Sequence, residues 1–164
     1  DKEGDLGRPF AWTAGKTLFK WFESIGVDEI VFRRQVYISA VCRCFPGKNP
    51  KGGDRVPDKK EIATCSQWLN KEIELLQPKL IIPVGKLAIS QYLMVNKLVD
   101  VIGKQTRQNI NGCDVDMIPL PQPPGASTWP RMSPGKELLA QALDLLAQHE
   151  CWKRLEKLST DERR

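Results

Sequence analysis

Long apolar runs are absent from this sequence of 164 residues. No stretch approaches the roughly 18 consecutive apolar residues that a membrane-spanning helix needs. The N-terminal residues are polar and acidic rather than typical of a secretory signal peptide. These two absences predict a soluble, cytoplasmic protein.

Histidine is scarce, and cysteine follows no regular pattern. The single histidine, His149, falls near the end of the last predicted helix, where it suits the helix dipole better than catalysis. The number of cysteines is odd, and they lack the density of a secreted disulfide scaffold. They occupy positions 42, 44, 65, 113 and 151. We expect free thiols or metal ligands, with Cys113 and Cys151 incidental.

Acidic residues are outnumbered by basic ones. The chain has 25 Lys and Arg against 20 Asp and Glu, a net charge of +5 and a pI near 9.0. This excess favours a polyanionic partner, although many basic proteins bind no nucleic acid. The length and the hydrophobic content of 41% suffice for a single core. We therefore predict one domain over residues 1–152 and a polar, frayed tail over residues 153–164.

Apolar periodicity predicts helices that alternate with strands. Helical spacing covers residues 13–26, 57–76 and 86–94 and a last helix around residues 138–146. Continuous apolar or β-branched runs predict strands at residues 36–41, 80–84 and 114–121. A surface loop is expected between the first helix and the first strand. This order indicates an α/β fold, a three-layer α/β/α domain with a central parallel sheet.

The loops after the three predicted strands are the places to look for a site, because ligands bind at the carboxyl ends of parallel strands. These loops span residues 42–47, 85–86 and 121–129. The first continues into a Pro/Gly-rich segment, residues 45–57, that carries Lys48, Lys51 and Arg55. Such a run either follows a phosphate backbone or forms an ordinary solvated face.

Five segments, taken in order, resemble one known family. They are Gly7-Arg8-Pro9-Phe10 with Ala14-Gly15, then residues 36–44, 57–65 and 78–85, and finally Pro119-Leu120-Pro121-Gln122-Pro123. The ordered set is similar to the bacterial and archaeal iron-sulfur uracil-DNA glycosylases. The resemblance implies a uracil-DNA glycosylase-like fold and hydrolysis of the N-glycosidic bond of uracil in DNA. The target nucleotide would first be flipped out of the helix.

The resemblance also assigns residues to the base. Phe10 matches the family's stacking aromatic, although a buried core Phe is the alternative. Pro46 and Gly47 belong to the same base-binding region. Ala40 occupies the place of an Asn that reads the uracil edge, and Gln122 the place of a His that donates a hydrogen bond to the leaving uracil. Gln122 keeps a neutral donor and is the candidate catalytic residue.

DNA is the partner that the resemblance implies, bound by a monomer. Relatives insert a side chain into the minor groove from the loop after the last motif, which makes Ser127, Trp129 and Arg131 candidates. A Trp129 packed on the last helix is the alternative. The resemblance adds Lys48, Lys51 and Arg55 as phosphate contacts.

Cys44 and Cys65 match two of the four cysteines that hold the family's 4Fe-4S cluster. The other two, and the family's first motif, belong upstream of Asp1. A cluster is therefore expected in a longer form of the protein and not in this chain alone. Two further functions stay open: a non-catalytic DNA-binding module of the same fold, and a nucleotide-binding α/β protein that uses Gly85 and the following helix N-terminus.

Overall fold

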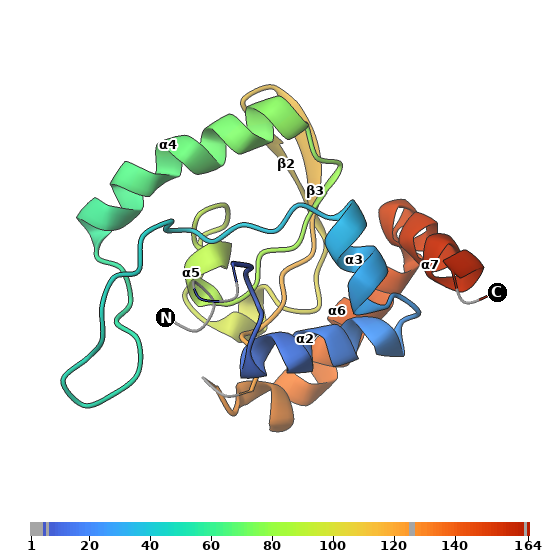
Figure 1. Cartoon of the computed structure of the whole chain (residues 1–164), viewed down its shortest axis with the longest axis horizontal. Helices are drawn as coiled ribbons and strands as arrows, with labels where there is room; N and C mark the ends of the chain where they lie inside the picture. The colour runs from blue at the N-terminus through green and yellow to red at the C-terminus, as the bar shows by residue number, and fades with distance from the viewer. Residues whose placement is uncertain (1–4, 6, 125–126, 163) are drawn as a thin grey trace.

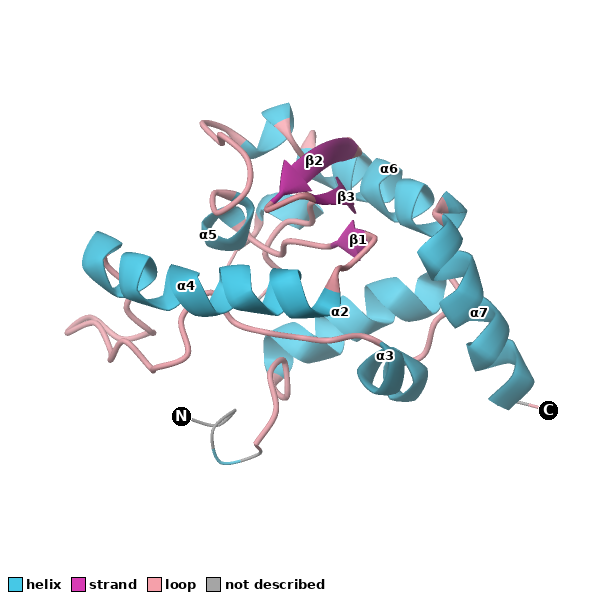
Figure 2. Cartoon of the chain, turned by 90° about the horizontal axis from the view of Figure 1, so that it is seen from above, coloured by secondary structure: helices cyan, strands magenta, loops and turns pink. Residues whose placement is uncertain are grey.

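The computed structural model of the chain describes residues 5, 7–124, 127–162 and 164. Helices surround a small sheet, and one long helix lies on the outside (Figures 1 and 2). The helices are α2 Thr13–Ser24, α3 Glu29–Gln35, α4 Lys59–Leu76, α5 Lys86–Ile89, α6 Gly135–Gln148 and α7 Glu150–Glu162. The strands are β1 Leu80–Ile81, β2 Thr106–Ile110 and β3 Cys113–Met117, and short 3-10 turns occupy Leu98–Asp100 and Trp129–Arg131.

The sheet is mixed, which corrects the prediction of a wholly parallel one. Its order is β1-β3-β2, with β1 parallel and β2 antiparallel to β3. β2 and β3 form a hairpin through Asn111 and Gly112, whose φ angles are 51° and 82°. This Asn-Gly pair is the sequence mark of a two-residue hairpin turn, and it identifies the strand that periodicity alone missed.

The apolar run at residues 80–84 is a strand for only part of its length. Leu80 and Ile81 pair with Asp116 and Met117, and a single parallel bridge then joins Val84 to Leu120. Pro83 interrupts the ladder because it has no N–H to donate. β1 is an edge strand in the described part of the chain.

The predicted strand at residues 36–41 is wrong for the structure as it stands. The segment follows α3 in an extended conformation and pairs with no described strand. Side chains hold it instead, because the Tyr37 hydroxyl donates to Glu72 of α4 over 2.7 Å and Arg43 pairs with the same carboxylate. The surface loop expected before it is also wrong, since α3 begins there with Asp28 as its N-cap.

α4 begins where its sequence predicts. The Asp58 carboxylate accepts from the Glu61 amide at 2.8 Å, and the Glu61 carboxylate accepts from the Asp58 amide at 2.8 Å, which completes a capping box. The apolar stripe predicted for this helix is buried only at Ile73. Much of the inner face of α4 is therefore only half covered.

The last helical segment corrects the prediction of a frayed tail. Residues 150–162 form α7, with Trp152 fully buried and its indole N–H donating to the Ile25 carbonyl over 2.9 Å. The Ser159 hydroxyl accepts from the Asp28 amide at 3.3 Å. α7 is thus part of the domain. The helix predicted at residues 86–94 is shorter than expected, and α5 ends at Ile89.

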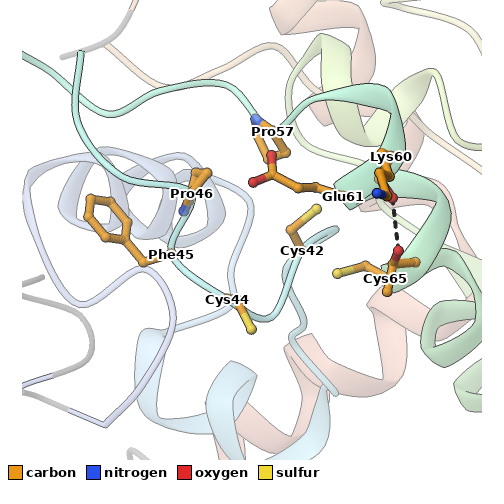
Figure 3. Close-up of a pocket in the computed structure, with 9 residues that line it drawn as sticks. Cys42, Cys44, Phe45, Pro46, Pro57, Lys60, Glu61 and Cys65 are labelled. Atoms are coloured by element: carbon orange, nitrogen blue, oxygen red, sulfur yellow. Dashed lines mark hydrogen bonds between the residues drawn. The ribbon is translucent and has the colours of Figure 1, made fainter. Parts of the chain in front are cut away.

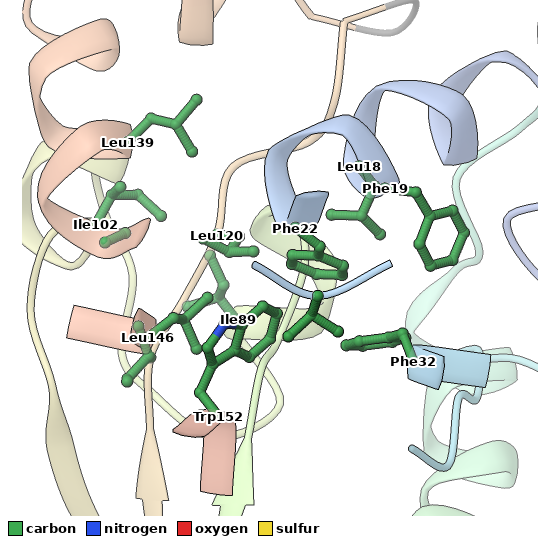
Figure 4. Close-up of a cluster of buried hydrophobic side chains, with 13 residues drawn as sticks. Leu18, Phe19, Phe22, Phe32, Ile89, Ile102, Leu120, Leu139, Leu146 and Trp152 are labelled. Carbon is green, nitrogen blue, oxygen red and sulfur yellow. The ribbon is translucent and has the colours of Figure 1, made fainter. Parts of the chain in front are cut away.

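The core lies where α2, α3, α6 and α7 meet the strand ends (Figure 4). Phe22 stacks on Phe32 with ring centroids 4.6 Å apart and meets Trp152 edge-on at 5.1 Å. Ile118 and Leu120, which follow β3, are fully buried in the same cluster. This packing fixes the start of the loop that carries Gln122.

Candidate functional site

Gln122 and Gly85 lie in contact at the carboxyl ends of β3 and β1. A Cβ at Gly85 would lie 2.4 Å from Oε1 of Gln122, so the end of the Gln122 side chain would have to shift if residue 85 carried a side chain. The Gly85 amide donates to the Leu120 carbonyl at 2.9 Å, and its φ of 85° also favours glycine. Pro121, Pro123 and Pro124 are buried on either side of the half-buried Gln122. Two of the three loops singled out from the sequence therefore meet.

Phe10 lies in a tight loop before α2 and is half-buried, with part of its ring against the core. Its φ of 53° places it in the left-handed region, which is unusual for a residue with a side chain. Its carbonyl points at α2, where a Cβ at Gly15 would lie only 1.7 Å from the oxygen. The other side of this loop contacts Arg33, a residue that the sequence did not single out.

Ala40 lies exposed on the extended segment between α3 and the basic loop, which comprises residues 45–57. Pro46 and Gly47 follow it and are half-buried. The position of this segment depends on Glu72, which accepts from Tyr37 and pairs with Arg43. The Oε2 atom of Glu72 is buried without a hydrogen-bond partner among the described residues. Burial, and to a lesser extent Glu72, raises the pKa of the nearby Tyr92 to about 12.

A pocket of about 270 Å³ opens between the same segment and the start of α4 (Figure 3). Cys42, Cys44 and Cys65 line it, together with Phe45, Pro46 and Glu61. Burial, followed by the neighbouring Cys65 side chain, raises the pKa of the Cys42 thiol to about 11. The fold thus brings the two cysteines that match the family to one pocket.

A complete metal site is not formed by these thiols. Among the residues that the structure describes, no cluster of three or more His, Cys, Asp or Glu side chains is arranged to hold a metal ion. Cys42 lies next to Cys65, while Cys44 is exposed at the same pocket. A full set of four requires thiolates from elsewhere.

The basic loop is an ordered hairpin that ends in the pocket wall. Lys48 and Asp54 form an antiparallel bridge, and Lys48 and Lys51 are both exposed. Arg55 is directed inward instead. Its guanidinium donates twice to Glu61, at 2.6 and 3.0 Å, and once to the Pro46 carbonyl at 2.9 Å. The hydrogen bonds from Arg55 and then from the Asp58 amide lower the pKa of Glu61.

The loop after Gln122 is described from Ser127 onward, and Gly125 and Ala126 lie outside the described residues. The Ser127 hydroxyl accepts from the Trp129 amide at 3.2 Å, and Arg131 is exposed. The Trp129 ring is half-buried over Gly135, where a Cβ would lie 2.7 Å from its Cδ2. Trp129 therefore packs on the first turn of α6.

His149 lies away from these loops, as its position at the end of α6 predicts. Its Nδ1 accepts from the Cys151 amide at 3.1 Å, so the proton resides on Nε2, which lies 3.0 Å from Oδ2 of Asp116. The contact with His149, and secondarily Arg107, lowers the pKa of Asp116. This pair joins β3 to the end of α6.

The described helices and strands form an α/β domain, and most of the candidate site residues lie on its loops. The family model of the uracil DNA glycosylase superfamily matches residues 1–147. The chain belongs to this superfamily. None of the helices formed by the described residues is long and apolar enough to cross a membrane.

Named relatives agree with the family. A type-4 uracil-DNA glycosylase of Saccharolobus solfataricus is 31% identical over 132 residues, which is 77% of this chain and 57% of that protein. One from Sulfurisphaera tokodaii is 38% identical over 87 residues, 52% of this chain and 36% of that protein. A type-5 uracil-DNA glycosylase of Pyrobaculum aerophilum is 35% identical over 65 residues, 40% of this chain and 26% of that protein. The matches to these three relatives span between 26% and 57% of their length.

Proposed function

We propose that this chain belongs to a DNA-repair hydrolase that excises uracil, or a related damaged base, from DNA. The observation that supports the proposal is the position of the half-buried Gln122 beside Gly85, where the loops that follow two strands meet. The family match and the names of the relatives support the same reaction. A DNA-binding module without activity is less favoured, because Gln122 retains a donor at the position of the family's His.

The proposed reaction assigns a role to each described loop. Phe10 stacks on the flipped base, while Pro46 and Gly47 line its pocket. Gln122 donates from its amide to the charge that develops on the departing uracil. Ala40 has neither donor nor acceptor to read the base edge, so it provides shape and no hydrogen bond.

The proposed DNA face lies on two loops. Lys48 and Lys51 follow the phosphate backbone, which carries most of the affinity and no sequence information. Arg131 contacts phosphate near Ser127, and Trp129 lies beside the flipped nucleotide. We assign Arg55 a structural role, because Glu61 and Pro46 occupy its guanidinium. The protein acts as a monomer in this proposal.

The finer architecture is also a proposal. In the described part of the chain β1 lies at the edge of the sheet, residues 36–41 are extended and pair with no strand, and α4 has a half-covered apolar face. One further parallel strand beside the edge of β1 would complete a three-layer α/β/α domain. The segment that supplies it would also carry the family's first motif.

The segment that supplies this further strand would also allow a cofactor to bind. Cys44 and Cys65 would hold a 4Fe-4S cluster together with two thiolates from that further segment. A bound cluster ties together the segments that carry its ligands.

An excision assay tests the proposal. The protein expressed from its complete reading frame is incubated with labelled duplexes that contain one uracil or none, and abasic products are cleaved with alkali. We expect cleavage at uracil only. Equal binding of both duplexes without cleavage would favour the non-catalytic module. The absence of both binding and cleavage would refute the DNA role.

A further inference from the structure

The guanidinium of Arg33 lies almost enclosed between α3 and the loop of Phe10. Its side chain is only 15% exposed. Nη1 donates to the Pro9 carbonyl at 2.9 Å and Nη2 to the Phe10 carbonyl at 3.0 Å. Nε donates to Oε1 of Glu29 at 2.7 Å, one turn earlier in the same helix. All three nitrogens therefore have partners, and two of these partners are backbone atoms of one loop.

The loop that Arg33 contacts is in an unfavourable conformation. A residue with a side chain adopts a φ of 53° only where its surroundings hold it there. The Phe10 carbonyl lies between Nη2 of Arg33 and the backbone of Gly15, where no Cβ fits. The loop is thus fixed from both sides, by a planar donor on α3 and by a glycine on α2.

The position of the guanidinium is fixed in turn by the core. Its carbon lies 4.5 Å from the ring centroid of Phe19, which is buried. α3 is held at its start by the Asp28 cap and at its side by Phe32. Arg33 therefore transmits the position of a packed helix to the Phe10 backbone.

We propose that Arg33 is a positioning residue for base binding: it holds Phe10 in the left-handed conformation that presents the ring to the flipped base. This inference rests on the proposed function, since it assumes that Phe10 stacks on the base. A lysine cannot replace Arg33, because an ammonium is a single point charge and cannot donate in a planar fork to two carbonyls.

The test compares Arg33→Lys with two controls. Arg34→Lys alters the adjacent residue, which is 63% exposed and pairs with Glu162. Glu29→Gln removes the ion pair of Arg33 but leaves the two carbonyl contacts. Hydrogen exchange of residues 9–19 reports on the loop independently of activity. Single-turnover excision of uracil from an oligonucleotide, made with and without Phe10→Ala, reports on the base.

We expect Arg33→Lys to accelerate exchange in residues 9–19 and to raise the half-saturating protein concentration about tenfold, the scale of one lost base–aromatic stack. The rate at saturation should stay within about threefold. In the Phe10→Ala background the same substitution should change the half-saturating concentration less than about twofold, because no ring remains to position. Both controls should behave as the parent protein does.

Three results would overturn the inference. Unchanged exchange in Arg33→Lys would mean that the loop does not depend on Arg33. An equal loss of excision with and without Phe10 would mean that Arg33 acts on stability alone. A parent protein that neither excises uracil nor prefers the uracil oligonucleotide to a thymine one would refute the proposed function and this role with it, while the exchange data would still show whether Arg33 holds the loop.

Discussion

Lys48 and Lys51 lie exposed on the basic hairpin, whereas Arg55 of the same segment donates to Glu61 and Pro46. Lys48→Ala with Lys51→Ala should weaken binding to any duplex equally and reduce the slope of log affinity against log salt by about two. Fluorescence anisotropy over a salt series measures both quantities. An unchanged slope would remove this hairpin from the DNA face.

Arg55→Ala is the matched comparison on the same hairpin. It should lower the thermal midpoint of unfolding, because it removes the partner of the α4 capping box, and it should change the salt slope less than either lysine does. If Arg55→Ala reduced the salt slope by the amount expected for one lost charge, Arg55 would again be a phosphate contact, as the sequence suggested.

Individual residues differ in how well the sequence revealed them. The Pro-flanked Gln122 and the loop of Phe10 were predicted because their motifs are local. Arg33 was not, because its partners lie 23 and 24 residues away and only the packing of α3 brings them together. The same holds for Glu72, which lies 35 residues from Tyr37. The i,i+4 spacing of Glu29 and Arg33 indicates their ion pair, but nothing local indicates the contacts with the Phe10 loop.

α7 is the element whose role the sequence concealed. Its composition is strongly polar, yet Trp152, Leu155 and Ser159 fall on one face at helical spacing, and Trp152 is fully buried. Trp152→Ala should lower the free energy of unfolding by about 3–5 kcal/mol. Trp68→Ala, on the exposed face of α4, should change it by less than about 0.5 kcal/mol.

Urea unfolding of the two tryptophan variants measures this difference. Similar free energies of unfolding for both variants would contradict the packing of Trp152 and α7 against the core.

Local patterns predicted α2, α4 and α6 well, because caps and apolar stripes are encoded within each helix. Local patterns could not decide whether residues 36–41 form a strand. A strand is stable only with a neighbour, and its β-branched residues indicate only that it could pair. The short β1 shows the same dependence, since the apolar run continues to Val84 while regular pairing stops at Ile81.

At the scale of the whole molecule, burial is uneven, because the main core is closely packed while α4 buries little of its surface. The main core lies around Phe22, Ile118 and Trp152, whereas α4 buries only Ile73, and β1 is an edge strand among the residues that the structure describes. The Phe10 loop and Gln122 depend on the core, and the cysteine pocket depends on residues 36–47 and α4.

Single-turnover excision by Gln122 variants tests the central claim most directly, because a donor aimed at charge that forms in the transition state affects rate more than affinity. In the protein from the complete reading frame, Gln122→Ala should slow excision of uracil by about 10² to 10³. Gln122→His should accelerate uracil excision by a factor that approaches about 10² to 10³. DNA affinity should change little in either variant. Equal rates for Gln, Ala and His at position 122, in a protein that excises uracil, would contradict the assignment of Gln122 as the donor to the leaving base.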